Sequence, residues 1–144
     1  MANNNNKFNQ WSLTLLRVVL GIMFTYHGFL KFFVPGGFRG TIDFLTYLKM
    51  PLPIYSALVI SILEFFGGLL LIIGLITRWT AVLLILEMLV ALFKVHIKQG
   101  YLISDKAYGY EYIALILTVL LVILINGAGK LSVGKRFFKS KHLH

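Results

Sequence analysis

Four long apolar runs, separated by short polar stretches, form the main pattern of the sequence. The runs cover residues 11–33, 54–76, 79–97 and 110–126. Each approaches the roughly 20 residues that an α-helix needs to cross a hydrocarbon core about 30 Å thick. Because a segment in lipid must satisfy its own backbone hydrogen bonds, each run is predicted to be a transmembrane helix. The pattern therefore predicts an all-α membrane protein with four antiparallel transmembrane helices.

The connections between the runs predict how these helices are joined. A Pro-Gly-Gly turn signal at residues 35–37 follows the first run, and Pro51 precedes the second. Between them, residues 41–49 mix apolar and charged positions in the way that is typical of a helix lying in the membrane interface. Only residues 77–78 separate the second run from the third, so these two helices are predicted to be antiparallel neighbours. We therefore expect one short interfacial helix in the first outer loop.

The composition agrees with a single membrane domain. Of the 144 residues, 58% are hydrophobic and only 13% are charged, and the mean hydropathy is +0.83, which exceeds what a soluble domain of this length buries in one core. Residues 11–129 are predicted to form the transmembrane domain. Residues 1–10 are asparagine-rich and are predicted to be a disordered polar tail. Cysteine is absent, which excludes disulfides, thiol nucleophiles and thiolate metal sites.

The net charge of +9 is concentrated near the C-terminal end. Residues 130–144 are predicted to be a basic cytoplasmic tail, because the positive-inside rule places clustered cations in the cytoplasm. Its first five cations are Lys130, Lys135, Arg136, Lys139 and Lys141. An even number of crossings returns the N-terminus to the same side. We expect a multi-pass protein of the cell membrane, inner or plasma membrane, that contacts the lipid bilayer and binds no nucleic acid.

Two stripes, drawn at 100° per residue, combine ionisable and small side chains. The first run contributes Arg17, Gly21, Phe24, Gly28 and Lys31. The second run contributes Ala57, Ser61, Glu64, Gly67 and Gly68. Because small residues allow a neighbouring backbone to approach closely, both stripes are predicted to face protein and to shield the carboxylate from lipid.

Glu64 lies near the middle of its run, where a carboxylate costs about 2.5–3.5 kcal/mol or more. It has no cation at its own depth, so desolvation is expected to favour the protonated form, which can donate a hydrogen bond or carry a proton. Glu64 and His27 are the candidate catalytic residues. For His27, a helix-to-helix hydrogen bond is the alternative to a binding role.

The remaining ionisable residues of the runs have simpler interpretations. Arg17 and Glu87 lie at matching depths, and arginine keeps its charge in proteins, so they are predicted to form a structural ion pair. Glu87 shares a helical face with Lys94, whereas His96 falls on the opposite side if the helix remains regular. Lys94 and His96 lie near the interface, where snorkelling alone explains them.

With these residues in view, the chain resembles the DoxX family of small membrane proteins over about residues 16–132. The resemblance rests on the order and spacing of several short motifs. These are Arg17 and Gly21, His27-Gly28, Lys31, Phe44, Pro51, Glu64-Phe65-Phe66-Gly67-Gly68, Gly74-Leu75-Ile76-Thr77-Arg78, Glu87-Met88, His96, Gly100, Gly109-Tyr110-Glu111-Tyr112, Gly127, Gly129 and Leu131-Ser132. The fold that the resemblance implies is the four-helix one already predicted.

The resemblance also implies a function. The family is linked to the membrane subunit of thiosulfate:quinone oxidoreductases and to redox complexes with other enzymes, so a quinone-linked membrane role and a redox partner protein are implied. We expect the chain to be an oxidoreductase subunit that acts with its partner. As a hypothesis, Lys31 and His27 hold a quinone head group and Glu64 relays a proton, with Glu111 and His96 as further cofactor-binding candidates.

Two alternatives from other classes remain open at this stage. The protein is a non-catalytic accessory or small-carrier subunit if the buried charges are only structural. A haem held by His27 and His96 is disfavoured because the two residues lie at different depths. Quinone stays the candidate cofactor, as the resemblance implies, and no haem or metal is expected.

Overall fold

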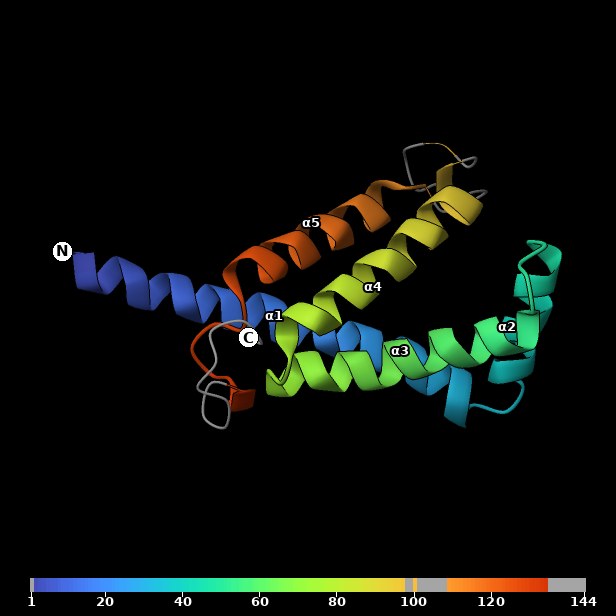
Figure 1. Ribbon diagram of the computed structural model, residues 1–144, viewed down its shortest axis with the longest axis horizontal. Coiled ribbons are helices and arrows are strands. Elements are labelled where there is room, and N and C mark those ends of the chain that lie inside the picture. The colour runs from blue at the N-terminus through green and yellow to red at the C-terminus, as the bar shows by residue number, and fades with distance from the viewer. Residues whose placement is uncertain (1, 98–99, 101–108, 135–144) are drawn as a thin grey trace.

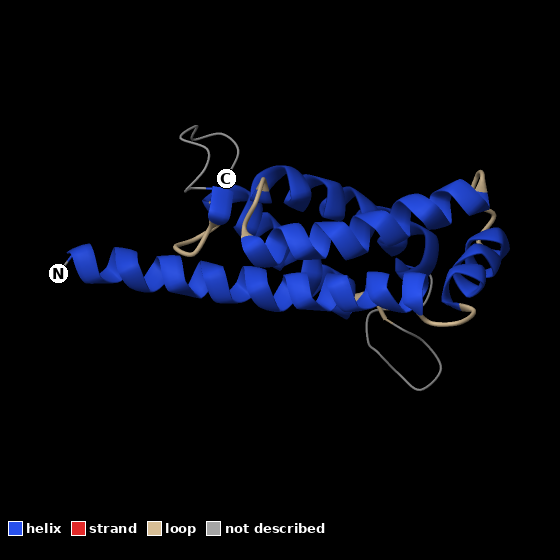
Figure 2. Ribbon diagram, turned by 90° about the horizontal axis from the view of Figure 1, so that it is seen from below, coloured by secondary structure: helices blue, strands red, loops and turns tan. Residues whose placement is uncertain are grey.

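The computed structural model describes residues 2–97, 100 and 109–134. The chain is all-helical over these ranges and contains no strand there (Figure 2). In order, the elements are α1 (Ala2–Phe33), α2 (Gly37–Tyr47), α3 (Pro53–Ile73), α4 (Thr77–Ala91), the π-helical η1 (Leu92–His96) and α5 (Glu111–Asn126). Most of the third connection and residues 135–144 of the predicted basic tail lie outside the described residues.

Among the described residues, three helices are long and apolar enough to cross a membrane. They are Gln10–Phe33, Pro53–Ile73 and Thr77–His96. The fourth predicted span corresponds to α5, an apolar helix of 16 residues, which is about 24 Å long at 1.5 Å per residue. The predicted helical class is confirmed, and each predicted span has a helix at its position.

The N-terminal segment differs from its prediction. Residues 2–10 belong to α1 rather than to a separate disordered tail. Forming the first turn is the unfavourable step in making a helix, and the apolar run of α1 forms that turn. Each further residue then extends an existing helix at little cost in free energy. The asparagine-rich composition of residues 1–10 indicates a polar tail, but it carries no information about the helix that follows it.

The helices form two antiparallel pairs that diverge toward one end of the molecule (Figure 1). α1 packs along α3, and α4 packs along α5. A short turn between Ile73 and Thr77 joins α3 to α4, which confirms the prediction that they are neighbours. From this turn α4 runs away from α3, so the two helices separate toward the far end. We call the end with the turn the inner end and the opposite end the outer end.

Helix α2 lies across the outer end of the α1–α3 pair (Figure 1). It follows the predicted turn, where Gly36 adopts a left-handed backbone with φ 81°. Leu45 is its buried residue, and the helix packs on α1 and α3. The short outer helix predicted at residues 41–49 is therefore present, shifted by a few residues.

The α1–α3 contact is as close as the stripes of small residues predicted. A Cβ atom on Gly28 would lie 2.3 Å from the backbone nitrogen of Phe65, and one on Gly68 would lie 2.4 Å from that of Thr25. Real Cβ atoms essentially never come within 3.0 Å of another backbone, so both positions require glycine. The two backbones touch directly, and this contact fixes α1 on α3.

Candidate functional site

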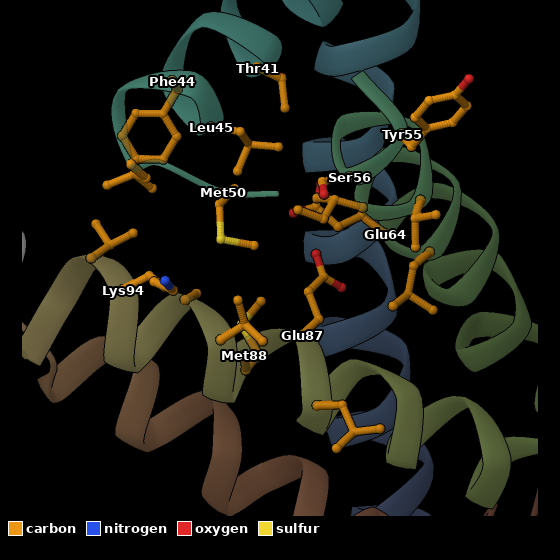
Figure 3. Close-up of a pocket in the computed structure, with 18 of the residues that line it drawn as sticks. Thr41, Phe44, Leu45, Met50, Tyr55, Ser56, Glu64, Glu87, Met88 and Lys94 are labelled. Atoms are coloured by element: carbon orange, nitrogen blue, oxygen red, sulfur yellow. The ribbon is translucent and has the colours of Figure 1, made fainter. Parts of the chain in front are cut away.

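A cavity of about 640 Å³ lies where α4 diverges from α3, with α2 at its outer end (Figure 3). Its wall is largely aliphatic and aromatic, with contributions such as Phe44, Leu45 and Met50 from α2 and the segment after it, and Met88 from α4. This volume is within the range of cavities that bind cofactors and drug-sized molecules. The separation of the helix pairs has therefore produced a cavity inside the bundle.

Three ionisable groups from three helices meet on the wall of this cavity: Lys31 of α1, Glu64 of α3 and Glu87 of α4. The Lys31 Nζ donates a hydrogen bond to the Glu64 Oε2, and the two side chains form an ion pair. Glu64 is only 7% exposed. The carboxylate is thus shielded from lipid, as predicted.

The prediction that Glu64 has no cation at its depth is wrong. Side chains on a helix point back toward its N-terminus. Because Lys31 lies near the C-terminal end of α1, its long side chain reaches deeper into the molecule than its backbone position indicates. The partner of Glu64 therefore comes from a residue that was placed nearer the outer end.

Glu87 completes the group of charges. Its side chain reaches from α4 into the cavity, toward Glu64 (Figure 3). Its Oε2 is buried and has no hydrogen-bond partner among the described residues. One ammonium and two carboxyl groups from three helices therefore lie together on this wall.

Lys94 belongs to the same wall at the outer edge of the cavity (Figure 3). It lies in η1, where the helix widens from α-helical to π-helical hydrogen bonding. Single π turns in helices are frequent at functional sites. The predicted common face of Glu87 and Lys94 is confirmed, because both residues line the cavity.

The structure does not bring the other predicted site residues to this cavity. His27 is exposed, with its ring against Tyr26 at a centroid distance of 6.5 Å. Its neighbour Gly28 is the residue that faces α3, so a rotation of 100° per residue turns His27 outward. Glu111 and His96 are half-buried at helix ends and do not line the cavity. For His96 the condition of a regular helix is not met, because it ends η1.

The predicted Arg17–Glu87 ion pair is absent, and both residues are described. Arg17 is 1% exposed and donates from Nη2 to the carbonyl oxygen of Leu131, while its Nε and Nη1 lack partners in the described part of the chain. The segment after α5 also binds Gly74, whose carbonyl oxygen accepts a 2.8 Å hydrogen bond from Ser132 Oγ. Arg17 therefore holds the C-terminal segment at the inner end. Among the described helices, α1 packs mainly on α2, α3 and α5, so Arg17 does not lie against Glu87 of α4.

Glu87 is accordingly the cavity residue that the sequence analysis had assigned to an ion pair instead. The signal for it was present, because it shares a face with Lys94 and is an acidic residue deep in an apolar run. In the part of the chain that the structure describes, no group of three or more histidine or acidic side chains is arranged to hold a metal ion.

Comparison with known proteins identifies the family of the chain. The sequence model of the DoxX family matches residues 12–97, a stretch that includes Lys31, Glu64 and Glu87. The chain belongs to the DoxX family. It is thus a DoxX-family membrane protein, and the predicted resemblance is confirmed.

Two relatives of this DoxX-family chain extend along nearly its whole length. A Haemophilus influenzae protein described as uncharacterized is 33% identical over 143 residues, which is 95% of this chain and 98% of the relative. A Bacillus subtilis protein with the name "Putative oxidoreductase CatD" is 33% identical over 136 residues, which is 94% of each chain. No solved structure matches the chain.

Proposed function

We propose that this DoxX-family membrane protein is the membrane subunit of a quinone-linked redox complex and that the cavity receives the quinone head group. One observation carries the proposal: an ammonium and two carboxyl groups meet on one wall of a largely apolar cavity. A quinone needs hydrogen-bond donors at its carbonyl oxygens, an apolar path and a proton for each electron that it accepts. The wall supplies donors and protonatable groups in one place.

Each group has a distinct role in this proposal. Glu87, whose Oε2 has no partner among the described residues, would donate a proton to a carbonyl oxygen of a bound quinone. Glu64 would return a proton to Glu87, and Lys31 would balance the negative charge that remains on the carboxyl pair. Reduction to the quinol consumes two electrons and two protons, so a partner protein must deliver the electrons. The oxidoreductase name of the Bacillus subtilis relative supports a redox role.

Quinone binding to the purified protein in lipid nanodiscs tests the proposal. We expect decylubiquinone to bind the wild-type protein, and we expect Glu64→Gln and Glu87→Gln to weaken binding by about tenfold, the value of one charge-assisted hydrogen bond. Glu111→Gln is the matched control, because Glu111 does not line the cavity. Equal binding by all four proteins, or no binding by the wild type, would refute the head-group site.

The proposal includes an arrangement in the membrane. α1, α3, α4 with η1, and α5 cross as four antiparallel helices, and both termini lie in the cytoplasm of the cell. The exposed apolar side chains on the described helices support this arrangement, since these faces match lipid. The chain has no cysteine, so single cysteines introduced at Asn4 and Thr46 can be labelled selectively in intact cells. Labelling of the Thr46 position alone by a membrane-impermeant maleimide is the expected result.

A non-catalytic accessory or small-carrier subunit is the second candidate. The observation that favours it is that Lys31 and Glu64 already satisfy one another without a ligand, so the pair also serves to hold α1 on α3. Mass spectrometry of the gently purified protein separates the two functions. Bound quinone together with a redox enzyme supports the proposed complex, whereas structural lipid alone supports the accessory role.

A further inference from the structure

The cavity has an apolar opening on its side, between α3 and α4. Among the lining residues that are also exposed on the outer surface, four aliphatic ones follow this seam: Val59 of α3, and Leu83, Leu86 and Val90 of α4. Their exposed fractions are 61%, 49%, 55% and 44%. A residue that is exposed and also lines the cavity borders an opening, and we call these four residues the portal. All four are aliphatic, so the portal suits hydrocarbon rather than water.

Two other sides of the cavity are closed by packed helices. The backbones of α1 and α3 touch at Gly28 and Gly68. Behind α4, the contact with α5 is filled by Leu84 and Leu120, which are both 0% exposed. The outer end lies under α2, where the lining residues Phe44, Leu52 and Tyr55 are exposed. The cavity therefore has an aliphatic approach along the seam between α3 and α4, and a second approach at the outer end that includes a tyrosine.

The portal leads directly to the ionisable groups. Leu83 and Val90 stand four residues before and three residues after Glu87, so they share its face of α4. A polar head that passes between the portal residues reaches the Glu87 carboxyl within about one helical turn, 5.4 Å. The cavity of about 640 Å³ accommodates a head group and a short piece of chain, so a longer apolar tail must remain outside.

From this geometry we infer that the ligand enters sideways from the bilayer through the portal. The ligand is a lipid-dissolved amphiphile whose tail stays among the acyl chains while its head reaches Glu87. The chemistry of the head rests on the proposed function, whereas the route rests on the portal itself. A water-dissolved substrate that enters past α2 is the alternative.

Bulky substitutions in the portal test the route. Leu86→Trp and Val90→Trp in nanodiscs are expected to lower the association rate of decylubiquinone by about tenfold. Leu115→Trp is the matched control, because Leu115 is 62% exposed on α5 and does not line the cavity. Leu48→Trp, on the wall beneath α2, tests the alternative. Unchanged rates in the portal variants, or slowing in the Leu48 variant alone, would overturn the route without affecting the head-group site.

A second measurement does not depend on quinone. A bimane label on Leu63→Cys, inside the cavity, is expected to be quenched by phospholipids that carry a nitroxide on the acyl chain and protected from aqueous iodide. Adding Leu86→Trp should reduce the nitroxide quenching. Acyl-chain quenching without any quinone binding would retain the portal and reject the proposed function. Quenching by iodide and not by the nitroxide would reject the portal.

Discussion

Helix α3 forms two seams that differ in how closely they are packed. Against α1 the backbones touch, with less than 3 Å available to a Cβ on Gly28 or Gly68. Against α4 the contact is ordinary at the inner end, where a Cβ on Gly67 would lie 3.5 Å from Leu84, and it opens into the cavity farther out. Glu64 stands where the two seams meet.

This difference shows how the bundle can place rigid packing in one seam and space for a ligand in the other. The α1–α3 seam holds the Lys31–Glu64 ion pair in a fixed geometry, while the α3–α4 seam leaves space next to the same carboxyl group. A buried ion pair needs a rigid and well-satisfied environment, and a ligand needs room and an unpartnered polar atom. Changes in the tight seam should therefore affect folding, and changes in the open seam should affect binding.

The largest effect on folding is expected from Lys31→Met, which leaves the buried Glu64 without its cation. The free energy of unfolding should fall by about 3 kcal/mol, the cost of breaking a buried pair by removing one partner. Unfolding by sodium dodecyl sulfate in mixed micelles measures this value. The double variant Lys31→Met/Glu64→Gln should recover much of the loss, because no charge is stranded. Equal stability of the single and double variants would mean that the pair is not formed.

A second prediction tests the tight seam through its backbone contact. Gly28→Ala should lower the free energy of unfolding by about 2 kcal/mol, since the added Cβ overlaps the α3 backbone at Phe65. Gly40→Ala is the matched control. A Cβ at Gly40, within α2, meets nothing within 4 Å, and alanine favours a helix over glycine. If both variants have the same stability, the α1 and α3 backbones are not in contact.

Much of the tight seam could be predicted from the sequence. The spacing of Gly21, Gly28 and Lys31 on one helix, and of Glu64 and Gly68 on the other, identified both faces, and each of those faces is in contact. Periodicity reports which side of a helix is apolar, small or charged. Periodicity therefore predicts a helix–helix contact well when both helices carry a row of small and ionisable residues on the facing side.

The open seam was less predictable for two physical reasons. Periodicity in one helix does not report how that helix is rotated against another, so matching depth paired Arg17 with Glu87 although α1 packs mainly on α2, α3 and α5. In the tight seam, too, one contact was missed: the depth of a backbone position differs from the depth of a long side chain, so the pairing of Lys31 with Glu64 was not predicted. The π-helical turn that ends at His96 has no simple sequence signal.

A third and smaller effect follows from this correction at the inner end. Arg17→Met should change the free energy of unfolding by about 1 kcal/mol or less, because it loses one hydrogen bond to Leu131 but also removes a buried, incompletely paired guanidinium. The effect of Arg17→Met should add to that of Glu87→Gln within about 0.5 kcal/mol, since residues without contact are independent. If the unfolding free energies of the two variants depart from additivity by much more than this value, Arg17 and Glu87 do interact, as their similar depths suggested.

The smallest effect is expected at His27, one residue from the tight seam. His27→Ala should leave the free energy of unfolding within about 0.5 kcal/mol of the wild type, as for other exposed positions, although Gly28→Ala next to it is destabilising. Decylubiquinone binding in nanodiscs should also be unchanged, because the His27 ring contacts Tyr26 and is turned away from the cavity. Weakened binding in His27→Ala, equal to that in Glu87→Gln, would show that the head group lies on the outer face of α1. The open seam would then be a consequence of packing rather than the site of function.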